Sequence, residues 1–349
     1  MLQNLKEPVK EAIKSLVHKS GYVIRQLDEL DHHLEATSAD VPLPEGAESV
    51  LRGDHPRLRE LRQRYAELSQ HPAAAHSYWT SGFVQKNVDL RTFRGDNAYV
   101  WQMRHARRDA DMRYFANTLY VERIDHRKLL DRLEEDGVFG CHRFKYHGRK
   151  AVSRDLLDSI NEIYFLERHA GLFDQPELRV LDIGAGYGRL AYRMAQAVPN
   201  LKSYVCVDAV PESSFLSEYY LQFRGIPPER AEAVPLYEIE TLLQRPPFHL
   251  AVNVHSFTEC NSAAIRWWLQ LVSRLNIPQI FIVPNKGPAG SAHDLYSIES
   301  DGQRLDFTPL LEEAGYRLEQ CVPKYDDPHL QMGVRWFAHT QYYLFRKIA

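Results

Sequence analysis

The sequence has few cysteines, no long apolar run and no surplus of charge of one sign. Its four cysteines are scattered without the spacing of metal ligands. No apolar run approaches the roughly 18 residues of a membrane span, and the N-terminus is charged where a secretory signal would be apolar. The 43 Lys and Arg nearly balance the 46 Asp and Glu, so no overall field attracts nucleic acid or an anionic membrane. These absences predict a cytoplasmic, reduced protein that binds neither nucleic acid nor membranes.

The stretch from residue 179 to residue 191 carries the most informative pattern. An apolar run typical of a buried strand ends at three alternating glycines, and apolar residues at helical spacing follow. Strand, glycine turn and helix form the first half of a nucleotide-binding βαβ unit, in which glycines let the backbone turn tightly beside a ligand. A dinucleotide fingerprint would need its third glycine at position 189, which is Arg189. The spacing therefore argues against NAD.

The next predicted strand, residues 203–208, ends in a carboxylate. Asp208 follows Gly188 by about 20 residues, the separation at which an acidic residue reaches the ribose hydroxyls of a nucleotide. Asp182 and the glycines after it resemble motif I of class I S-adenosylmethionine (SAM) methyltransferases. The resemblance implies SAM as cofactor and S-adenosylhomocysteine as its product. It implies a cofactor site that comprises Asp182, Gly184, Ala185, Gly186, Tyr187, Gly188, Asp208, Ala209 and Asn253.

The rest of the chain alternates as a doubly wound sheet requires. Ser153 is expected to cap a helix that ends at Gly171, directly before the first strand. The predicted fold class is α/β: a class I methyltransferase, Rossmann-like seven-stranded sheet with helices on both faces, preceded by a mainly helical N-terminal region. We expect a SAM-binding catalytic domain at 151–349. Residues 1–150 are expected to form a helical cap that contributes to substrate binding and is a candidate for homo-oligomer formation. Later strands are predicted at 231–236, 248–254, 279–283, 316–323 and 341–345.

Catalytic residues are expected at the end of the fourth strand, because ligands of open α/β sheets bind beyond the carboxyl ends of the strands. Strand alternation would place Asn253 and His255 on one side, with Glu259 at the start of the next helix. A hydroxyl becomes a better nucleophile when a base takes its proton, and histidine, with an ordinary pKa of about 6.5, is the common base near neutral pH. His255 is the first candidate and Glu259 the second, the alternative for His255 being a structural role. His293, beside Asp294, is the third.

Aromatic side chains and amides crowd residues 76–150, as in a wall that stacks against sugar rings and bonds their hydroxyls. Tyr99 and Trp101 are the substrate candidates there, although for any single ring the core of a helical domain is the simpler explanation. Asp294 and Asp326 are further candidates for contacts to the acceptor. Asp326 and its acidic neighbour lack a third carboxylate at a convincing ligand spacing, so no metal is expected.

Three segments, residues 181–190, 253–259 and 153–159, resemble more narrowly a bacterial family of sugar O-methyltransferases. The resemblance covers about residues 76–349. It implies a small-molecule glycosylated substrate, a deoxysugar of a natural product or a glycan, that is methylated on a hydroxyl by in-line displacement with general-base assistance. Two alternatives stay open. One is a SAM-dependent O- or N-methyltransferase of a non-sugar natural product, and the other is a methyltransferase-fold protein that binds a ligand without catalysis.

Overall fold

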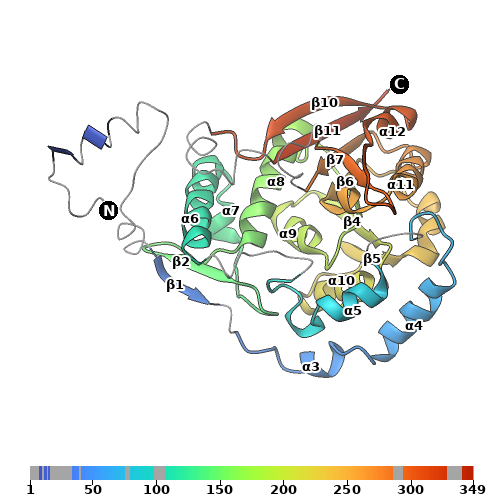
Figure 1. Cartoon of the computed structure of the whole chain (residues 1–349), viewed down its shortest axis with the longest axis horizontal. Coiled ribbons are helices and arrows are strands. Elements are labelled where there is room, and N and C mark those ends of the chain that lie inside the picture. Colours follow the sequence, from blue (N-terminus) through green and yellow to red (C-terminus); the bar gives the residue numbers. More distant parts are fainter. Residues whose placement is uncertain are drawn as a thin grey trace.

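A seven-stranded mixed sheet forms the centre of the structure, a computed structural model (Figure 1). It describes residues 8–9, 12–13, 15, 34–38, 41–74, 79–97, 107–285, 294–327 and 340–348. Across the sheet the strands lie in the order β10-β11-β7-β6-β3-β4-β5. Their bounds are β3 (Leu178–Ile183), β4 (Leu201–Asp208), β5 (Ala231–Pro235), β6 (Leu250–Val254), β7 (Gln279–Val283), β10 (Tyr316–Pro323) and β11 (Gln341–Lys347).

The strand directions divide the sheet into a parallel part and a closing hairpin. β3 runs parallel to β4 and β6, β4 runs parallel to β5, and β6 runs parallel to β7. β11 is antiparallel to both β7 and β10. The chain order reverses at β3, which lies between β4 and β6, and open α/β sheets bind ligands at such a switch point. The predicted seven-stranded sheet with a terminal hairpin is confirmed.

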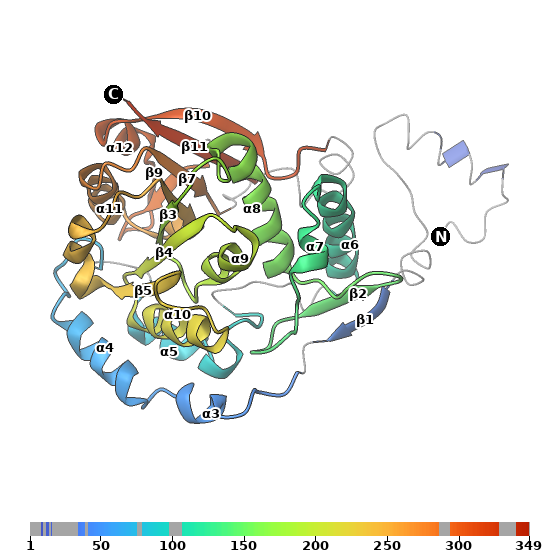
Figure 2. The same ribbon diagram turned by 180° about the vertical axis from the view of Figure 1, so that it is seen from behind.

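The parallel strands are connected by α9 (Arg189–Ala197), α10 (Pro211–Phe223), the 3₁₀ helix η3 (Leu236–Gln244) and α11 (Ser262–Arg274). In addition, α8 (Arg154–Ala170) precedes β3, and α12 (Thr308–Glu313) precedes β10. Right-handed crossovers place α9 and α10 on one face of the sheet and α11 on the other. Figure 2 shows α8 beside α9, and α9 packs against β4. The predicted limits of α8 are confirmed. Ser153 Oγ accepts a hydrogen bond from Leu156 N at 3.1 Å, and Gly171 ends the helix in a left-handed conformation.

The N-terminal part is not entirely helical. Its helices are α3 (Ala47–Val50), α4 (Pro56–Ala66), α5 (Ser81–Asn87), η2 (Leu90–Thr92), α6 (Arg107–Ile124) and α7 (Leu129–Arg132). However, β1 (Leu34–Ser38) pairs antiparallel with β2 (Arg143–Tyr146), so the region expected to form a helical cap also contains a two-stranded sheet. A second small hairpin, β8 (Tyr296–Ile298) with β9 (Arg304–Asp306), was not predicted either. Short strands of three to five residues leave too little periodicity to recognise.

Residues 41–74 and 79–97, here called the N-terminal strap, pass around the outside of α10 (Figure 1). Arg57 makes two hydrogen bonds to the Glu218 carboxylate, at 2.9 and 2.6 Å. Arg62 Nε donates at 2.8 Å to Glu212, whose side chain is fully buried at the start of α10. Ser81 Oγ donates to the same carboxylate oxygen at 2.5 Å. The strap is therefore attached by buried polar contacts to the helix that follows β4.

A buried ion network attaches the end of the strap to the sheet helices. Arg94, 1% exposed, contacts Glu135 Oε2 at 2.8 Å through Nη2, and Arg193 Nη2 contacts the same oxygen at 3.0 Å. Ser153 Oγ donates to this oxygen at 2.6 Å. The pKa of Glu135 is well below its ordinary value: burial raises it, but the two guanidinium groups lower it more. The ionised network therefore fixes the strap, α8 and α9 relative to one another.

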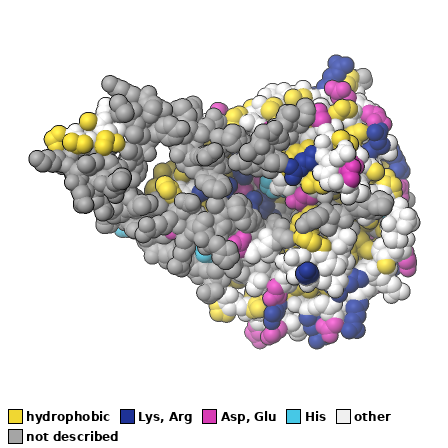
Figure 3. Space-filling view, viewed as in Figure 1, with side chains coloured by type: hydrophobic (Ala, Val, Ile, Leu, Met, Phe, Trp, Pro, Cys, Tyr) yellow, Lys and Arg dark blue, Asp and Glu magenta, His cyan; other side chains and the backbone are white. Residues whose placement is uncertain are grey.

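The described surface shows charges of both signs. On the face seen in Figure 3, Lys and Arg side chains are interspersed with Asp and Glu side chains over the described residues. None of the helices in the described part of the chain combines the length and the apolar character that crossing a membrane requires.

Candidate active site

Three glycines shape the turn between β3 and α9. Gly184, Gly186 and Gly188 have φ values of 73°, 60° and 80°, a left-handed conformation that residues with a Cβ disfavour. A Cβ on Gly184 would lie 2.0 Å from Oγ and 2.3 Å from Cβ of Ser256. A Cβ on Gly186 would meet no heavy atom within 4 Å. Gly184 thus lets the chain beyond β6 approach the turn, while Gly186 borders open space in which a ligand fits.

Asp208 ends β4 and lies against this turn. Its Oδ2 accepts a hydrogen bond from Gly186 N at 3.1 Å, and its Oδ1 accepts one from Val210 N at 3.0 Å. Burial raises the pKa of Asp208 to about 7, although both backbone hydrogen bonds lower it. From the strap, the Tyr65 hydroxyl donates to the backbone oxygen of Asp208 at 3.1 Å and accepts from Leu236 N at 2.9 Å. The strap thereby fixes the strand end that carries the carboxylate.

Asp182 provides a second carboxyl group in the same cavity. Its Oδ2 accepts a hydrogen bond from the Tyr204 hydroxyl at 2.8 Å. Burial raises the pKa of Asp182 to about 7, against the lowering effects of the Tyr204 hydrogen bond and of Arg189. Tyr187, inside the glycine turn, donates its hydroxyl proton to Asp155 at the start of α8. The predicted residues Asp182, Tyr187 and Asp208 are therefore brought together around one cavity, with Gly184, Ala185, Gly186 and Ala209.

The end of β6 differs from the prediction. β6 stops at Val254, and His255 has a φ of 69°, which turns the chain away from strand geometry. Asn253 is 1% exposed and does not line the cavity. Its Nδ2 donates to Ile183 O at 2.8 Å, and its Oδ1 accepts from Phe257 N at 3.0 Å. The expectation that Asn253 and His255 share one side is wrong, because alternation ends with the strand. Asn253 stabilises the turn through these hydrogen bonds, outside the lining of the cavity.

His255 lines the cavity in an unusual backbone conformation. Its backbone N–H donates to Val283 O at 2.6 Å, and its ring Nδ1 lies 3.3 Å from Pro284 O. A carbonyl next to Nδ1 fixes the tautomer with the proton on Nδ1, so Nε2 carries the lone pair. Burial, together with Arg154 and Lys324, lowers the pKa of His255 to about 3. The imidazole is therefore neutral throughout the physiological pH range, and the expected titration near 6.5 does not apply.

Glu259 lies at the end of the short 3₁₀ helix η4 (Ser256–Glu259), not at the start of α11. Its Oε2 accepts a hydrogen bond from Trp79 Nε1 of the strap at 2.5 Å. Its Oε1 accepts one from Asn285 Nδ2, beyond the end of β7, at 2.7 Å. Burial raises the pKa of Glu259 to about 7, and the two hydrogen bonds oppose that effect. Glu259 thus links the strap to the strand ends.

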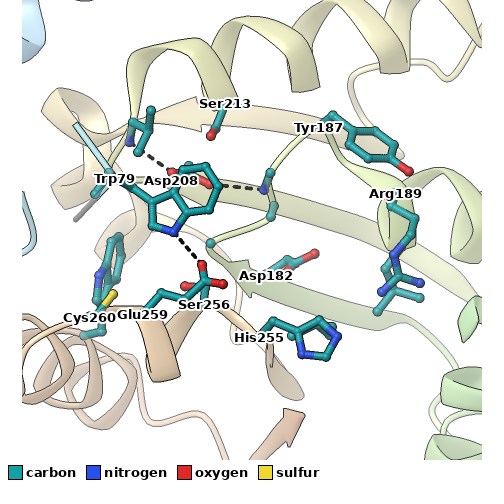
Figure 4. A pocket seen from close by; sticks show the side chains of 18 of the residues that line it. Trp79, Asp182, Tyr187, Arg189, Asp208, Ser213, His255, Ser256, Glu259 and Cys260 are labelled. Atoms are coloured by element: carbon teal, nitrogen blue, oxygen red, sulfur yellow. Dashed lines mark hydrogen bonds between the residues drawn. The ribbon is translucent and has the colours of Figure 1, made fainter. Parts of the chain in front are cut away.

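The cavity has two chemically different ends (Figure 4). At one end, Arg154, Asp158 and Arg189 surround His255 with charge. Arg154 Nε lies 3.3 Å from Asp158 Oδ2, and Lys324 Nζ lies 2.7 Å from Asp158 Oδ1. At the other end, Trp79, Glu259 and Cys260 lie near Asp208. The apolar and aromatic residues that also line the cavity include Ala73, Ala209, Val210 and Trp268.

Other sequence candidates lie elsewhere. Tyr99, Trp101 and His293 fall outside the described residues. Asp294 does not line the cavity, and its Oδ2 accepts from the Tyr343 hydroxyl of β11 at 3.0 Å.

Asp326 is exposed and borders a separate, smaller cavity with Tyr120, so the structure does not bring it to the glycine turn. Within the described ranges, no three His, Cys, Asp or Glu side chains are grouped so that they could hold a metal ion.

Several residues of the cavity were missed at the level of sequence. Arg154 and Asp158 stand four residues apart on α8, so they share one helix face, and this spacing was the available signal. Trp79 was noticed as one aromatic residue among many, and nothing local distinguished it. It reaches the cavity because Thr80 caps α5 and Ser81 bonds to buried Glu212.

The known proteins that match this chain come from comparison with solved structures. No protein-family model matches the chain, and no curated protein sequence does. The [4+2]-cyclase SpnF matches with a TM-score of 0.39 at 15% identity, over 56% of this chain and 82% of its own. The mitomycin 7-O-methyltransferase MmcR matches with 0.36 at 17% identity, over 55% of this chain and 57% of its own. Geranyl diphosphate C-methyltransferase from Streptomyces coelicolor A3(2) matches with 0.39 at 10% identity, over 54% and 78%.

The strand order, the antiparallel β11 and the glycine turn after β3 together decide the architecture. The fold is that of the class I methyltransferases. These structural similarities extend over little more than half of the chain.

Proposed function

We propose that this chain is a SAM-dependent O-methyltransferase that acts on a hydroxyl of a glycosyl group. The cofactor assignment depends on one observation, the binding space between Gly186 and Asp208. Open space borders Gly186, and the Asp208 carboxylate is fixed beside it by the Gly186 and Val210 amides. A carboxylate in that place suits a ribose diol, and the charged end of the cavity suits an amino-acid group, for which Asp182 offers a negative partner and Arg154 a positive one.

His255 is the residue that we assign to proton transfer. SAM, when bound, supplies a methyl group on a cationic sulfur that a hydroxyl oxygen can attack in line. The Nε2 lone pair of His255 accepts the hydroxyl proton as the oxygen gains the methyl group. A pKa near 3 is sufficient for this task, because an oxygen that bears both a proton and a new alkyl group is a far stronger acid than such an imidazolium. Glu259 is less suited, since each of its oxygens already accepts a hydrogen bond.

A glycosyl acceptor is supported by the sequence resemblance. Association of copies through the N-terminal helices and a cytoplasmic location remain predictions.

Matched pairs of acceptors test the proposal. Purified protein would be incubated with SAM and with glycosylated natural products, each beside its aglycone, and the products analysed by mass spectrometry and NMR. We expect a mass gain of one methyl group, located on a sugar oxygen, for glycosylated members only. Methylation of aglycones would favour the non-sugar alternative. Absence of SAM and S-adenosylhomocysteine binding in calorimetry would refute the cofactor assignment itself.

A further inference from the structure

The aromatic end of the cavity contains a side chain from far upstream in the sequence. Trp79 belongs to the strap, yet it lines the same cavity as Asp208 and Glu259. Figure 4 shows its indole beside Asp208 and above Glu259, with Asp182, Arg189 and His255 on the other side of the cavity. Nothing in the role of the glycine turn or of His255 explains an indole at this place.

The ring is held in a defined orientation. Its Nε1 donates to Glu259 Oε2 at 2.5 Å, and Phe83 packs edge-on against it with ring centroids 5.3 Å apart at 83°. Asn285 fixes the other Glu259 oxygen at 2.7 Å. Thr80, the next residue, begins α5 by accepting a hydrogen bond from Phe83 N at 3.1 Å. The indole is therefore preorganised by contacts on both sides of the cavity.

The two ends of the cavity match the two ends of the proposed cofactor. The methionine part of SAM is charged and fits the end that contains Arg154, Asp158 and Arg189. Adenine is planar and apolar on its faces, with polar edges, and fits an end lined by aromatic and small apolar groups. Ribose joins the two parts, and Asp208 lies beside the indole, across the cavity from Arg189 and His255. The indole is thus on the side where the base must lie if Asp208 binds the ribose.

We propose that Trp79 stacks against the adenine ring of the cofactor and that Glu259 orients the indole for this contact. This inference rests on the proposed SAM-dependent function, which it extends to a binding residue outside the sheet domain. Stacking of a base on an aromatic side chain contributes enough that alanine substitution weakens binding by about 5-fold to 150-fold. Trp79 is then a cofactor-binding residue, and Glu259 is a positioning residue.

Calorimetric titration of the full-length protein tests the stacking. The two probes are S-adenosylhomocysteine and 5′-methylthioadenosine, which has the same nucleoside but no amino-acid group. Trp79→Ala should weaken both probes by the same factor within the stated range, because the lost contact is with the base. Trp79→Phe should retain most of the affinity for both. Trp267→Ala is the matched control: Trp267 packs on His71 of the strap, with ring centroids 4.4 Å apart, but does not line the cavity. Its binding should stay within about twofold of the wild type.

Tryptophan fluorescence tests the same stacking contact. This measurement depends neither on turnover nor on a large change in folding. Addition of 5′-methylthioadenosine should quench the indole emission of the wild-type protein, and this quenching should be reduced in Trp79→Phe but not in Trp267→Phe. Glu259→Gln should weaken both probes less than Trp79→Ala does.

The possible failures are distinguishable. If the wild-type protein binds neither probe, the proposed function fails. If the wild type binds and Trp79→Ala binds equally well, the stacking inference alone fails. Tighter binding to Trp79→Ala would show that the indole obstructs the site, and that result also overturns the inference.

Discussion

Alanine substitutions at two glycines of the same turn should have different consequences. Gly184→Ala puts a Cβ 2.3 Å from Ser256 Cβ, an atom that cannot rotate away. The left-handed φ of 73° costs about 1–2 kcal/mol for a residue with a Cβ, and overpacking adds about 1–3 kcal/mol, so we expect a loss of about 2–5 kcal/mol in the free energy of unfolding. Gly186→Ala has a φ of 60° but open space around its Cβ, and should lose only about 1–2 kcal/mol.

For ligand binding we expect the opposite order of the two substitutions: relative to its loss of stability, Gly186→Ala should lose more affinity than Gly184→Ala. The Cβ of Gly186→Ala enters the space assigned to the cofactor, so its affinity for S-adenosylhomocysteine should fall well beyond what its small loss of stability suggests. Urea unfolding followed by circular dichroism measures the first quantity, and calorimetry measures the second. Ser256→Gly removes both atoms that the Gly184→Ala methyl group meets. A double-mutant cycle between these two positions should therefore give a favourable coupling of about 1–3 kcal/mol.

Three results would refute this reasoning. Equal destabilisation by Gly184→Ala and Gly186→Ala would mean that the chain beyond β6 does not approach the turn as described. A cycle without coupling would mean that Ser256 is not the obstacle. Unchanged affinity in Gly186→Ala would move the ligand away from the turn.

Three further predictions concern proton transfer, binding and stability. His255→Gln should lower turnover by roughly 10²–10⁴-fold with little change in S-adenosylhomocysteine affinity, and near-normal turnover would contradict the assignment of His255 to proton transfer. Since the pKa of His255 is about 3, a wild-type rate inflection near pH 6.5 that disappears in this variant would contradict the lowered pKa. With its pKa raised to about 7, Asp208 binds a proton below that pH, so S-adenosylhomocysteine binding should tighten from pH 6 to pH 8 and release protons, as shown by calorimetry in buffers of different ionisation enthalpy. Asp208→Asn should reduce this dependence and leave the part that is due to Asp182, whose pKa is also raised to about 7. Glu135→Gln leaves Arg94 and Arg193 without their buried carboxylate and should cost about 3–5 kcal/mol in urea unfolding, whereas a loss below about 1 kcal/mol would show that the network is not ionised.

Much of the sheet could be predicted from the sequence because its signals are local. The strands at 279–283 and 316–323 were predicted with the limits that the structure gives them. For β7 the signal is an apolar run, residues 280–283, in a segment bounded by Pro278 and Pro284. Ser153 and Gly171 likewise mark the ends of α8 through hydrogen-bonding capacity and conformational freedom, which belong to single residues.

The candidate site was only partly predictable because its geometry depends on a departure from regular structure. His255 adopts a left-handed conformation, although a residue with a Cβ disfavours it, and the period-two rule for side chains fails at that residue. Asn253 consequently faces the glycine turn from below and bonds to Ile183, while His255 enters the cavity. A single sequence gives no sign of such a backbone exception, which is characteristic of functional sites.

The contribution of the strap could not be predicted because it arises from contacts between residues far apart in the chain. Tyr65 and Trp79 reach Asp208 and Glu259, and neither has a local pattern that specifies its partner. Their effect on the site is nevertheless direct, since one fixes the strand end that carries a carboxylate and the other closes the aromatic end of the cavity. A sheet domain that begins at residue 151 contains the glycine turn and both acids but lacks these two supports. The cavity is therefore built jointly by the sheet and the strap, so the proposed binding of a nucleoside depends on the packing of residues 41–74 and 79–97 on α10.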